Sequence, residues 1–189
     1  EIPYERYAML MFHPVTTEPH RIQHDAHTLI DVLLEDTNNY IVIYPNNDLG
    51  SSFIINEYER FSSQKRFRVF PSLRFEYFLV MLKYCQFIIG NSSAGIREAP
   101  YYGVPSINIG TRQNNRALNP EIINCIYEKE AIEKSIERAL NIDRYAPKIL
   151  FGRGESDKLF LETITKPLFW EVDKQKVFME IGSIAPMCH

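Results

Sequence analysis

The sequence predicts an α/β domain in which a parallel, Rossmann-like sheet carries helices on both faces. Short apolar runs alternate along the chain with longer stretches whose apolar residues recur at helical spacing. The runs at 7–12 and 40–44 are continuously apolar, which is typical of strands that are buried on both faces. Several of them end abruptly, at Pro45, Gly90 and Gly110. In such a fold a ligand binds outside the carboxyl ends of the strands, so the loops at these ends are where a site is expected.

The first half of the chain contains the clearest strand, 40–44 (Tyr-Ile-Val-Ile-Tyr), which is rich in β-branched and aromatic residues and stops at Pro45. Thr16, Thr17 and Pro19 predict a helix start, because hydroxyl side chains cap helices and proline is favoured in the first turn. In chain order the expected elements are strand 7–12, helix 20–35, strand 40–44, helix 53–61, strand 67–70 and helix 75–84.

The second half continues the alternation with a strand that ends sharply at Gly90 and a loop of small polar residues behind it. No internal repeat and no long linker interrupts the pattern, so we expect one domain over 1–189. The expected elements are strand 87–89, loop 91–95, helix 96–102, strands 106–109 and 122–127, helix 128–140, and helical stretches 155–164 and 172–181.

Composition argues against several classes of protein. The 189 residues carry 21 basic and 24 acidic side chains, a net charge of −3, whereas general nucleic-acid or membrane-surface binders are basic. No apolar run approaches the roughly 20 residues of a membrane-spanning helix, and the first residues do not resemble a signal peptide. Cys85, Cys125 and Cys188 are odd in number and far apart, which favours a reducing, cytoplasmic setting without a disulfide framework. We therefore expect no nucleic-acid or membrane partner, and the missing initiator Met suggests a piece of a longer chain.

The most informative stretch is the loop after strand 87–89. Its small residues let a ligand approach the backbone, Ser92 and Ser93 add hydroxyl donors, and the following helix start suits a phosphate. Glu98 lies about one turn into that helix, where a carboxylate can accept hydrogen bonds from a ribose diol. Neither the Walker loop nor the dinucleotide fingerprint is present. The alternative is that the serines only cap the helix and Glu98 is solvated.

Two neighbouring strand ends add basic side chains to the same region. Arg112 follows strand 106–109, and a guanidinium binds phosphate oxygens in a bidentate way. His13 follows the first strand and can donate a hydrogen bond to a phosphate. Taken singly, Arg112 is more often a solvated loop charge and His13 a structural histidine. In the predicted sheet, however, both converge with the serines on one crevice.

Three histidines have a spacing that can bind zinc. His20, His24 and His27 recur at i, i+4 and i+7 on one face of the helix expected over 20–35. No carboxylate or cysteine partner stands out, and solvated histidines on a helix are the commoner case. We expect no metal site.

Five motifs lie along nearly the whole chain: 13–16 (His-Pro-Val-Thr), Pro45-Asn46 with Asp48, 90–100, 102–113 and the Phe-Gly-x-Gly of 151–154. In these motifs and in their order the sequence resembles UDP-N-acetylglucosamine 2-epimerases, and most of all the hydrolysing branch that makes N-acetylmannosamine for sialic acid synthesis.

The resemblance implies the C-terminal half of a two-domain GT-B fold, with the N-terminal domain absent and 167–189 a crossover helix and tail. It also implies a UDP site. His13 and Arg112 match residues near the diphosphate, and Glu98 matches the ribose-binding glutamate. Leu73 matches a backbone contact to uracil, although Arg74 stands where the family has proline. The implied UDP-binding residues are His13, Asn46, Leu73, Ser92, Ser93, Glu98 and Arg112.

In the family, removal of the C2 proton expels UDP and water then adds to the resulting glycal. The proton-handling carboxylates lie in the absent domain, so the resemblance gives this chain leaving-group stabilisation, with His13 as its one candidate catalytic residue, and no cofactor or metal. The chain alone is then expected to be inactive. The alternatives are an epimerase of a UDP-2,4-diacetamido-trideoxy sugar, a non-hydrolysing epimerase, a GT-B glycosyltransferase and a non-catalytic UDP-binding module. A homo-oligomer is left open.

Overall fold

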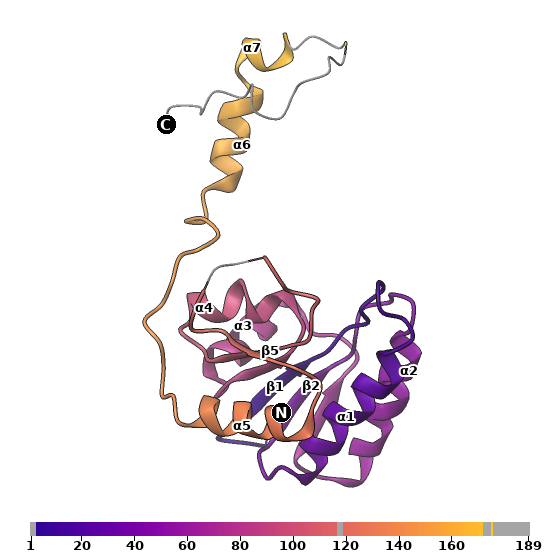
Figure 1. Ribbon diagram of the computed structural model, residues 1–189. Helices are drawn as coiled ribbons and strands as arrows, with labels where there is room; N and C mark the ends of the chain where they lie inside the picture. The colour runs from indigo at the N-terminus through magenta and orange to yellow at the C-terminus, as the bar shows by residue number, and fades with distance from the viewer. Residues whose placement is uncertain (1–2, 117–118, 172–174, 176–189) are drawn as a thin grey trace. The chain divides into compact units, whose positions relative to one another are not determined.

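The computed structural model describes residues 3–116, 119–171 and 175. Contacts divide the chain into two compact units, Glu1–Phe151 and Gly152–His189. Alternating strands and helices of the first unit are visible along the colour gradient of Figure 1.

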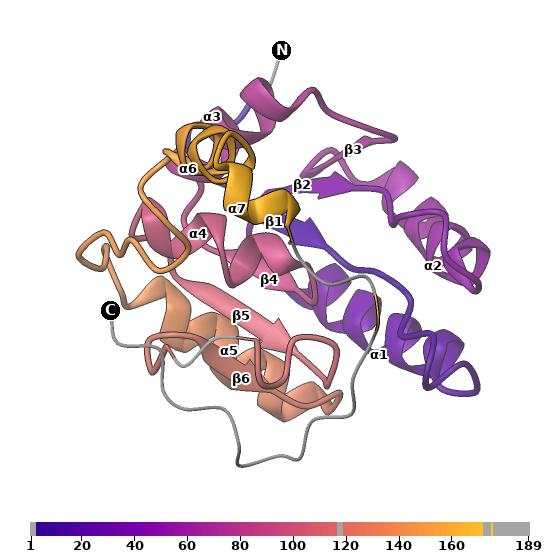
Figure 2. The same ribbon diagram turned by 90° about the horizontal axis from the view of Figure 1, so that it is seen from above.

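The first unit is built on a six-stranded parallel sheet with the order β3-β2-β1-β4-β5-β6, which Figure 2 shows from above. Because β2 and β3 lie on one side of β1 and the later strands on the other, the strand order reverses between β1 and β4. That reversal is the position where open α/β sheets bind ligands. The strands are β1 Ala8–Met11, β2 Tyr40–Ile43, β3 Phe67–Phe70, β4 Ile88–Gly90, β5 Ser106–Ile109 and β6 Ile123–Cys125.

Helices cover both faces of this sheet. One face carries α1 (Ile22–Glu35), α2 (Ser51–Tyr58) and α5 (Lys129–Leu140), and the other carries α3 (Phe75–Tyr84) and the single turn α4 (Glu98–Tyr101). Two short 3-10 turns complete the unit, η1 (Glu59–Ser63) after α2 and η2 (Ser93–Gly95) before α4.

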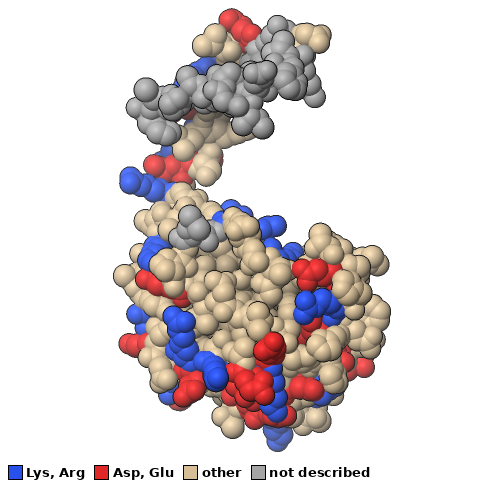
Figure 3. Space-filling model, viewed as in Figure 1, with Lys and Arg blue, Asp and Glu red and all other residues tan. Residues whose placement is uncertain are grey.

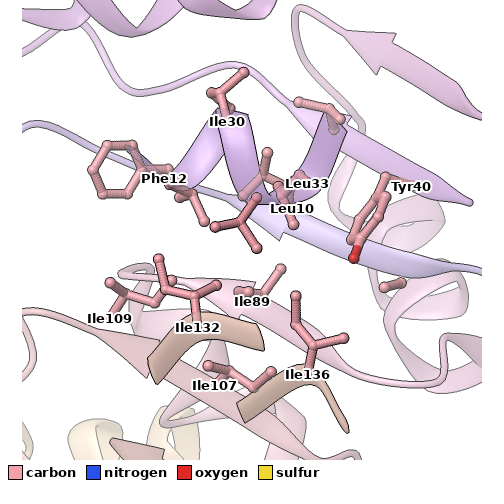
Figure 4. Packing of buried hydrophobic residues seen from close by; sticks show 14 of the residues in the cluster. Leu10, Phe12, Ile30, Leu33, Tyr40, Ile89, Ile107, Ile109, Ile132 and Ile136 are labelled. Atoms are coloured by element: carbon pink, nitrogen blue, oxygen red, sulfur yellow. The ribbon is translucent and has the colours of Figure 1, made fainter. Parts of the chain in front are cut away.

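Alternation along the strands creates two apolar cores. In β1, Leu10 faces the helices α1 and α5, while Met9 faces the core on the side of α3. Figure 4 shows the first core: strand residues point at Leu33 of α1 and at Ile132 and Ile136 of α5. Because β1 lies inside the sheet and buries both faces, its sequence is apolar at every position, which explains this continuous run.

The sequence-based elements agree closely with this structure. Strands 67–70 and 106–109 and helix 75–84 have the predicted bounds, and every other predicted strand is present within two residues at each end. The predicted helix start at Thr16, Thr17 and Pro19 is wrong. The helix begins at Ile22, and its N-cap residue Arg21 makes no side-chain capping bond.

The predicted helix 96–102 is also wrong in its start. A helix beginning at Ile96 would need an N–H on Pro100 to bond the Ile96 carbonyl, and proline has none. The chain instead forms the 3-10 turn η2 and enters α4 only at Glu98, so that Pro100 falls in the first helical turn. In place of the single helix expected behind the serines, the chain therefore forms two short turns, η2 and α4.

The second unit contains α6 (Ser156–Ile164), as predicted, and one helical turn, α7 (Pro167–Trp170). The indole Nε1 of Trp170 donates to the Ile164 carbonyl at 2.7 Å. The helix predicted over 172–181 lies outside the described residues.

The surface of the first unit carries charges of both signs. Figure 3 shows acidic and basic side chains mixed over its lower part, where α1 and α5 lie. Lys129 of α5, for example, pairs with Glu35 of α1 at 2.5 Å. No helix in the described part of the chain has both the length and the apolar character needed to cross a membrane.

Candidate functional site

The candidate site lies at the carboxyl edge of the sheet, on both sides of the point where the strand order reverses. His13 follows β1, Asn91 follows β4, and Arg112 follows β5. The structure thus brings together the strand ends that the sequence predicted to converge.

Asn91 joins these strand ends. It is fully buried, with 0% of its surface exposed. Its side-chain Oδ1 accepts a hydrogen bond from the His13 backbone N–H at 2.7 Å, and its Nδ2 donates to the His13 carbonyl at 2.8 Å. Its own backbone carbonyl accepts from Nη1 of Arg112 at 3.1 Å and from Nε2 of Gln113 at 2.8 Å. One residue of β4's end therefore fixes groups that come from β1 and β5.

The His13 ring is held by the loop after β2. The backbone N–H of Asn46 donates to Nδ1 of His13 at 3.1 Å, and the Asn46 side chain donates to Asp48 at 2.5 Å. Burial, and next the nearby Arg112 guanidinium, lowers the pKa of His13 to about 4, with Asp48 acting in the opposite direction. At neutral pH the ring is therefore uncharged, and because Nδ1 accepts a hydrogen bond, its proton sits on Nε2.

Arg112 supplies the positive charge of the site. Burial, followed by the like charge of Arg116, lowers the pKa of Arg112, yet a guanidinium keeps its proton at any ordinary pH. Within the described residues, its Nη1 donates to the Asn91 carbonyl and its other nitrogens have no protein acceptor. The arrangement offers N–H donors and a positive potential, which suits a phosphate group.

The serine loop is shaped by Gly90. This residue has a φ of +135°, and a Cβ built on it would lie 2.1 Å from the Met11 carbonyl oxygen, so only glycine fits between β4 and β1. Ser92 caps η2, and its hydroxyl accepts from the Ala94 N–H at 3.3 Å. Both Ser92 and Ser93 are half-buried. Ser92 thus caps the 3-10 turn while both serines stay partly exposed to solvent.

Glu98 and Leu73 stand apart from the hydrogen-bonded cluster. Glu98 opens α4, and its Oε2 is buried without a hydrogen-bond partner among the described residues. Such an oxygen is costly to bury unless a donor reaches it. Leu73 lies half-buried in the loop between β3 and α3, on the same edge but beyond β2.

A hollow of about 400 Å³ opens beside the serines. It is lined by Ser93, Ile96, Arg97, Gln113, Arg116 and Phe151. The Arg97 guanidinium lies 5.2 Å from the centre of the Phe151 ring. A second hollow, of about 340 Å³ between α1 and α5, is lined by Glu35, Asp36, Glu133 and Glu137 among others and would repel an anion.

Two of the three histidines in the region of α1, His24 and His27, have carboxylate neighbours. His24 lies 3.3 Å from Asp25, and His27 lies 3.3 Å from Asp31 and 3.1 Å from Glu57. In the described part of the chain, no group of three or more His, Cys, Asp or Glu residues is placed to hold a metal ion. Cys85 and Cys125 are buried and free.

Sequence reasoning missed Asn91 and Arg116. Asn91 was part of the predicted loop but had no role, because its importance comes from contacts with residues 78 positions away along the chain. The available signal was a polar residue placed directly after a strand-ending glycine. Arg116 is recognisable as a site residue only once the loop after β5 returns toward Arg112.

Comparisons with known proteins identify the family to which the chain belongs. Residues 1–165 match the sequence family described as UDP-N-acetylglucosamine 2-epimerase. A UDP-N-acetylglucosamine 2-epimerase of Neisseria meningitidis serogroup B is 46% identical over 184 residues, which are 96% of this chain and 48% of that protein. The polysialic acid biosynthesis protein P7 of Escherichia coli is 35% identical over 160 residues, 84% of this chain and 40% of that protein. The chain thus spans about half the length of the curated relatives it matches.

Solved structures confirm the fold class. A UDP-GlcNAc 2-epimerase of Methanocaldococcus jannaschii, solved with UDP-GlcNAc and UDP, superposes with a TM-score of 0.67 at 18% identity, covering 85% of this chain and 45% of that one. A UDP-GlcNAc 2-epimerase of Neisseria meningitidis bound to UDP-GlcNAc gives a TM-score of 0.62 at 14% identity, covering 85% and 45%. The expected Rossmann-like half of a GT-B architecture is therefore confirmed.

Proposed function

The chain belongs to the UDP-N-acetylglucosamine 2-epimerase family, and from that premise we propose that it is the UDP-binding half of a hydrolysing 2-epimerase. The overall reaction converts UDP-GlcNAc and water into N-acetylmannosamine and UDP. The missing N-terminal half would supply the proton-handling groups, so the chain alone binds UDP but turns over no substrate. The full-length protein is, in this proposal, a soluble cytoplasmic enzyme of amino-sugar synthesis.

One observation carries the proposal: a neutral histidine and a charged arginine are fixed together at the strand-order reversal. His13 presents an Nε2–H donor, and Arg112 presents guanidinium N–H groups that no described residue accepts; both are held through Asn91. A diphosphate placed there would receive hydrogen bonds from both. When UDP leaves, negative charge grows on its terminal phosphate, and preorganised donors stabilise that charge by on the order of 3 kcal/mol each.

The remaining parts of UDP are assigned to the neighbouring groups. The Ser92 and Ser93 hydroxyls face the phosphates, and the unpartnered Oε2 of Glu98 accepts from the ribose diol. Asn46 closes the site from the β2 loop, and the Leu73 backbone contacts uracil. The unpartnered buried oxygen is the strongest support for the ribose assignment, because a diol supplies the donor that it lacks.

The hydrolysing branch is favoured by the relatives. A UDP-N,N'-diacetylbacillosamine 2-epimerase (hydrolyzing) of Legionella pneumophila is 26% identical over 171 residues, and a GDP/UDP-N,N'-diacetylbacillosamine 2-epimerase (hydrolyzing) of Campylobacter jejuni is 31% identical over 118 residues. The name of the Escherichia coli relative supports a place in sialic acid synthesis. The names of the diacetylbacillosamine enzymes also make a UDP-2,4-diacetamido-trideoxy sugar the second candidate substrate.

The test supplies the missing half. The chain is fused to the N-terminal half of the 46% identical Neisseria relative and incubated with UDP-GlcNAc, and separately with the diacetamido sugar nucleotide. We expect free N-acetylmannosamine and UDP in equal amounts. UDP-linked N-acetylmannosamine as the product would contradict the hydrolysing assignment, and transfer to an added sugar acceptor without inversion at C2 would indicate a glycosyltransferase. A fusion that binds UDP but leaves both substrates unchanged would favour a non-catalytic module.

A further inference from the structure

We propose that Asn91 is a positioning residue for the diphosphate: from behind the site it sets the places of His13 and Arg112 without touching the ligand. This inference rests on the proposed function and adds to it a residue with no contact to UDP. Because Asn91 has no exposed surface, any effect it has on binding passes through the groups it holds.

The Asn91 side chain extends the pairing of β1 and β4 beyond the strands themselves. Met11 pairs with Gly90 as the last register of the ladder, and the Asn91 backbone N–H still donates to the Met11 carbonyl at 3.1 Å. The carboxamide then takes over and bonds both the N–H and the C=O of His13, at 2.7 and 2.8 Å. A side-chain amide thus replaces the next peptide of the ladder, and it fixes the backbone that carries the His13 ring.

The Asn91 backbone carbonyl controls the other side of the site. It accepts from Nη1 of Arg112 at 3.1 Å and from Nε2 of Gln113 at 2.8 Å, so two side chains from the loop after β5 converge on one oxygen. Gln113 is itself only 3% exposed. A hydrogen bond from an arginine to a buried carbonyl restricts where its remaining N–H groups point, which lowers the entropic cost of binding a phosphate.

The bonding pattern requires an asparagine. The two bonds to His13 need one acceptor and one donor at the same planar group. An ionised aspartate has two acceptors, so it would keep the bond from the His13 N–H but repel the His13 carbonyl. Alanine would lose both bonds while leaving the Asn91 backbone carbonyl available to Arg112.

The experiment compares Asn91→Asp and Asn91→Ala with matched changes at Asn108. Asn108 is a second buried asparagine, 4% exposed on the adjacent strand β5. Its Nδ2 donates to Oδ1 of Asn124 at 2.8 Å, and its own Oδ1 has no hydrogen-bond partner among the described residues. The variants Asn108→Asp and Asn108→Ala therefore reproduce the loss of a buried amide. Dissociation constants for UDP, inorganic pyrophosphate and uridine are measured well below the unfolding temperature of each variant.

We expect both Asn91 variants to bind UDP and pyrophosphate about tenfold or more weakly, the loss typical of a hydrogen bond to a charged group. Their affinity for uridine, which lacks phosphate, should stay within about twofold, as should all three affinities of the Asn108 variants. The ratio of UDP to uridine affinity is the decisive readout, since a loss of stability alone does not change it.

The outcomes separate this inference from the proposed function. If the unaltered chain binds UDP but the Asn91 variants bind UDP and pyrophosphate equally well, Asn91 has no positioning role and the proposed function stands. If the Asn108 variants lose phosphate affinity as much as the Asn91 variants do, the effect is general to the core and the positioning role is overturned. If the unaltered chain binds neither UDP nor pyrophosphate, the proposed function itself fails.

Discussion

The backbone N–H of Asn46 donates a hydrogen bond to Nδ1 of His13 at 3.1 Å, across 33 positions of sequence. The contact joins the ends of β1 and β2 and places the proton of the neutral imidazole on Nε2. It also explains how a histidine beside an arginine serves as a neutral donor. The consequences for pH, ligand binding and stability follow from this small set of contacts.

His13 makes the stability of the chain depend on pH in one direction. Its pKa is about 4 in the folded protein, against about 6.5 in an unfolded chain. Between these values the unfolded state binds more protons, so the free energy of unfolding rises with pH. The contribution is complete above about pH 6.5 and is lost as pH falls toward 4. Urea unfolding at pH 7 and pH 5 should show a smaller loss for His13→Gln than for the unaltered chain, and equal losses would contradict the assignment.

Arg112→Ala should weaken UDP and pyrophosphate alike, each by about tenfold to a hundredfold, because the side chain contacts phosphate and not the nucleoside. Calorimetric titration with both ligands measures this. Arg112→Lys is the control. It keeps the charge but loses the forked donors, so its affinity for each ligand should lie between that of the unaltered chain and that of Arg112→Ala. Unchanged affinity for both ligands in the alanine variant would remove Arg112 from the site.

Glu98→Ala should weaken UDP by about tenfold and pyrophosphate hardly at all, since only UDP carries the ribose. Glu98→Gln, which keeps the shape, should behave similarly. Because Oε2 of Glu98 is buried without a partner, neither change should lower the free energy of unfolding. Equal losses for the two ligands would rule out the ribose contact.

Gly90→Ala should destabilise the fold by about 2 kcal/mol or more, since it combines a strained φ with a close contact to backbone. The added Cβ would lie 2.1 Å from the Met11 carbonyl oxygen at a φ of +135°. Gly50→Ala is the matched control in the same unit, because Gly50 has a φ of +94° but its added Cβ would meet only the end of the Ile22 side chain, Cδ1 at 2.5 Å. Denaturant unfolding of the two variants separates the strain of a positive φ from the collision with backbone. Similar losses in the free energy of unfolding would contradict the collision with the Met11 carbonyl oxygen.

Most of the fold was predictable because its signals are local. A strand buried on both faces, such as Ala8–Met11, is apolar throughout its length, and helix Phe75–Tyr84 shows its buried side at regular spacing. The two helix starts that were predicted wrongly also have local causes, but the spacing of apolar residues does not reveal them. Pro100 delays the start of α4, and the chain turns after Thr17 before α1 begins at Ile22.

The candidate site was predictable in its members but not in its organisation. His13, Ser92 and Arg112 could be placed together because parallel strands bring their carboxyl ends to one edge. Asn91 could not be assigned, because its partners come from distant strands and its burial is visible only in the folded chain. The unpartnered oxygen of Glu98 is likewise a property of packing and not of sequence.

The most direct measurement is an NMR titration of the chain with UDP, following backbone amide shifts. We predict saturable shifts gathered at the carboxyl edge of the sheet, with uridine alone perturbing Glu98 and Leu73 more than His13 and Arg112. The residues expected to respond to UDP are His13, Asn46, Leu73, Ser92, Ser93, Glu98 and Arg112. No shifts at millimolar UDP, or shifts gathered at the acidic hollow between α1 and α5, would contradict a UDP site at this edge.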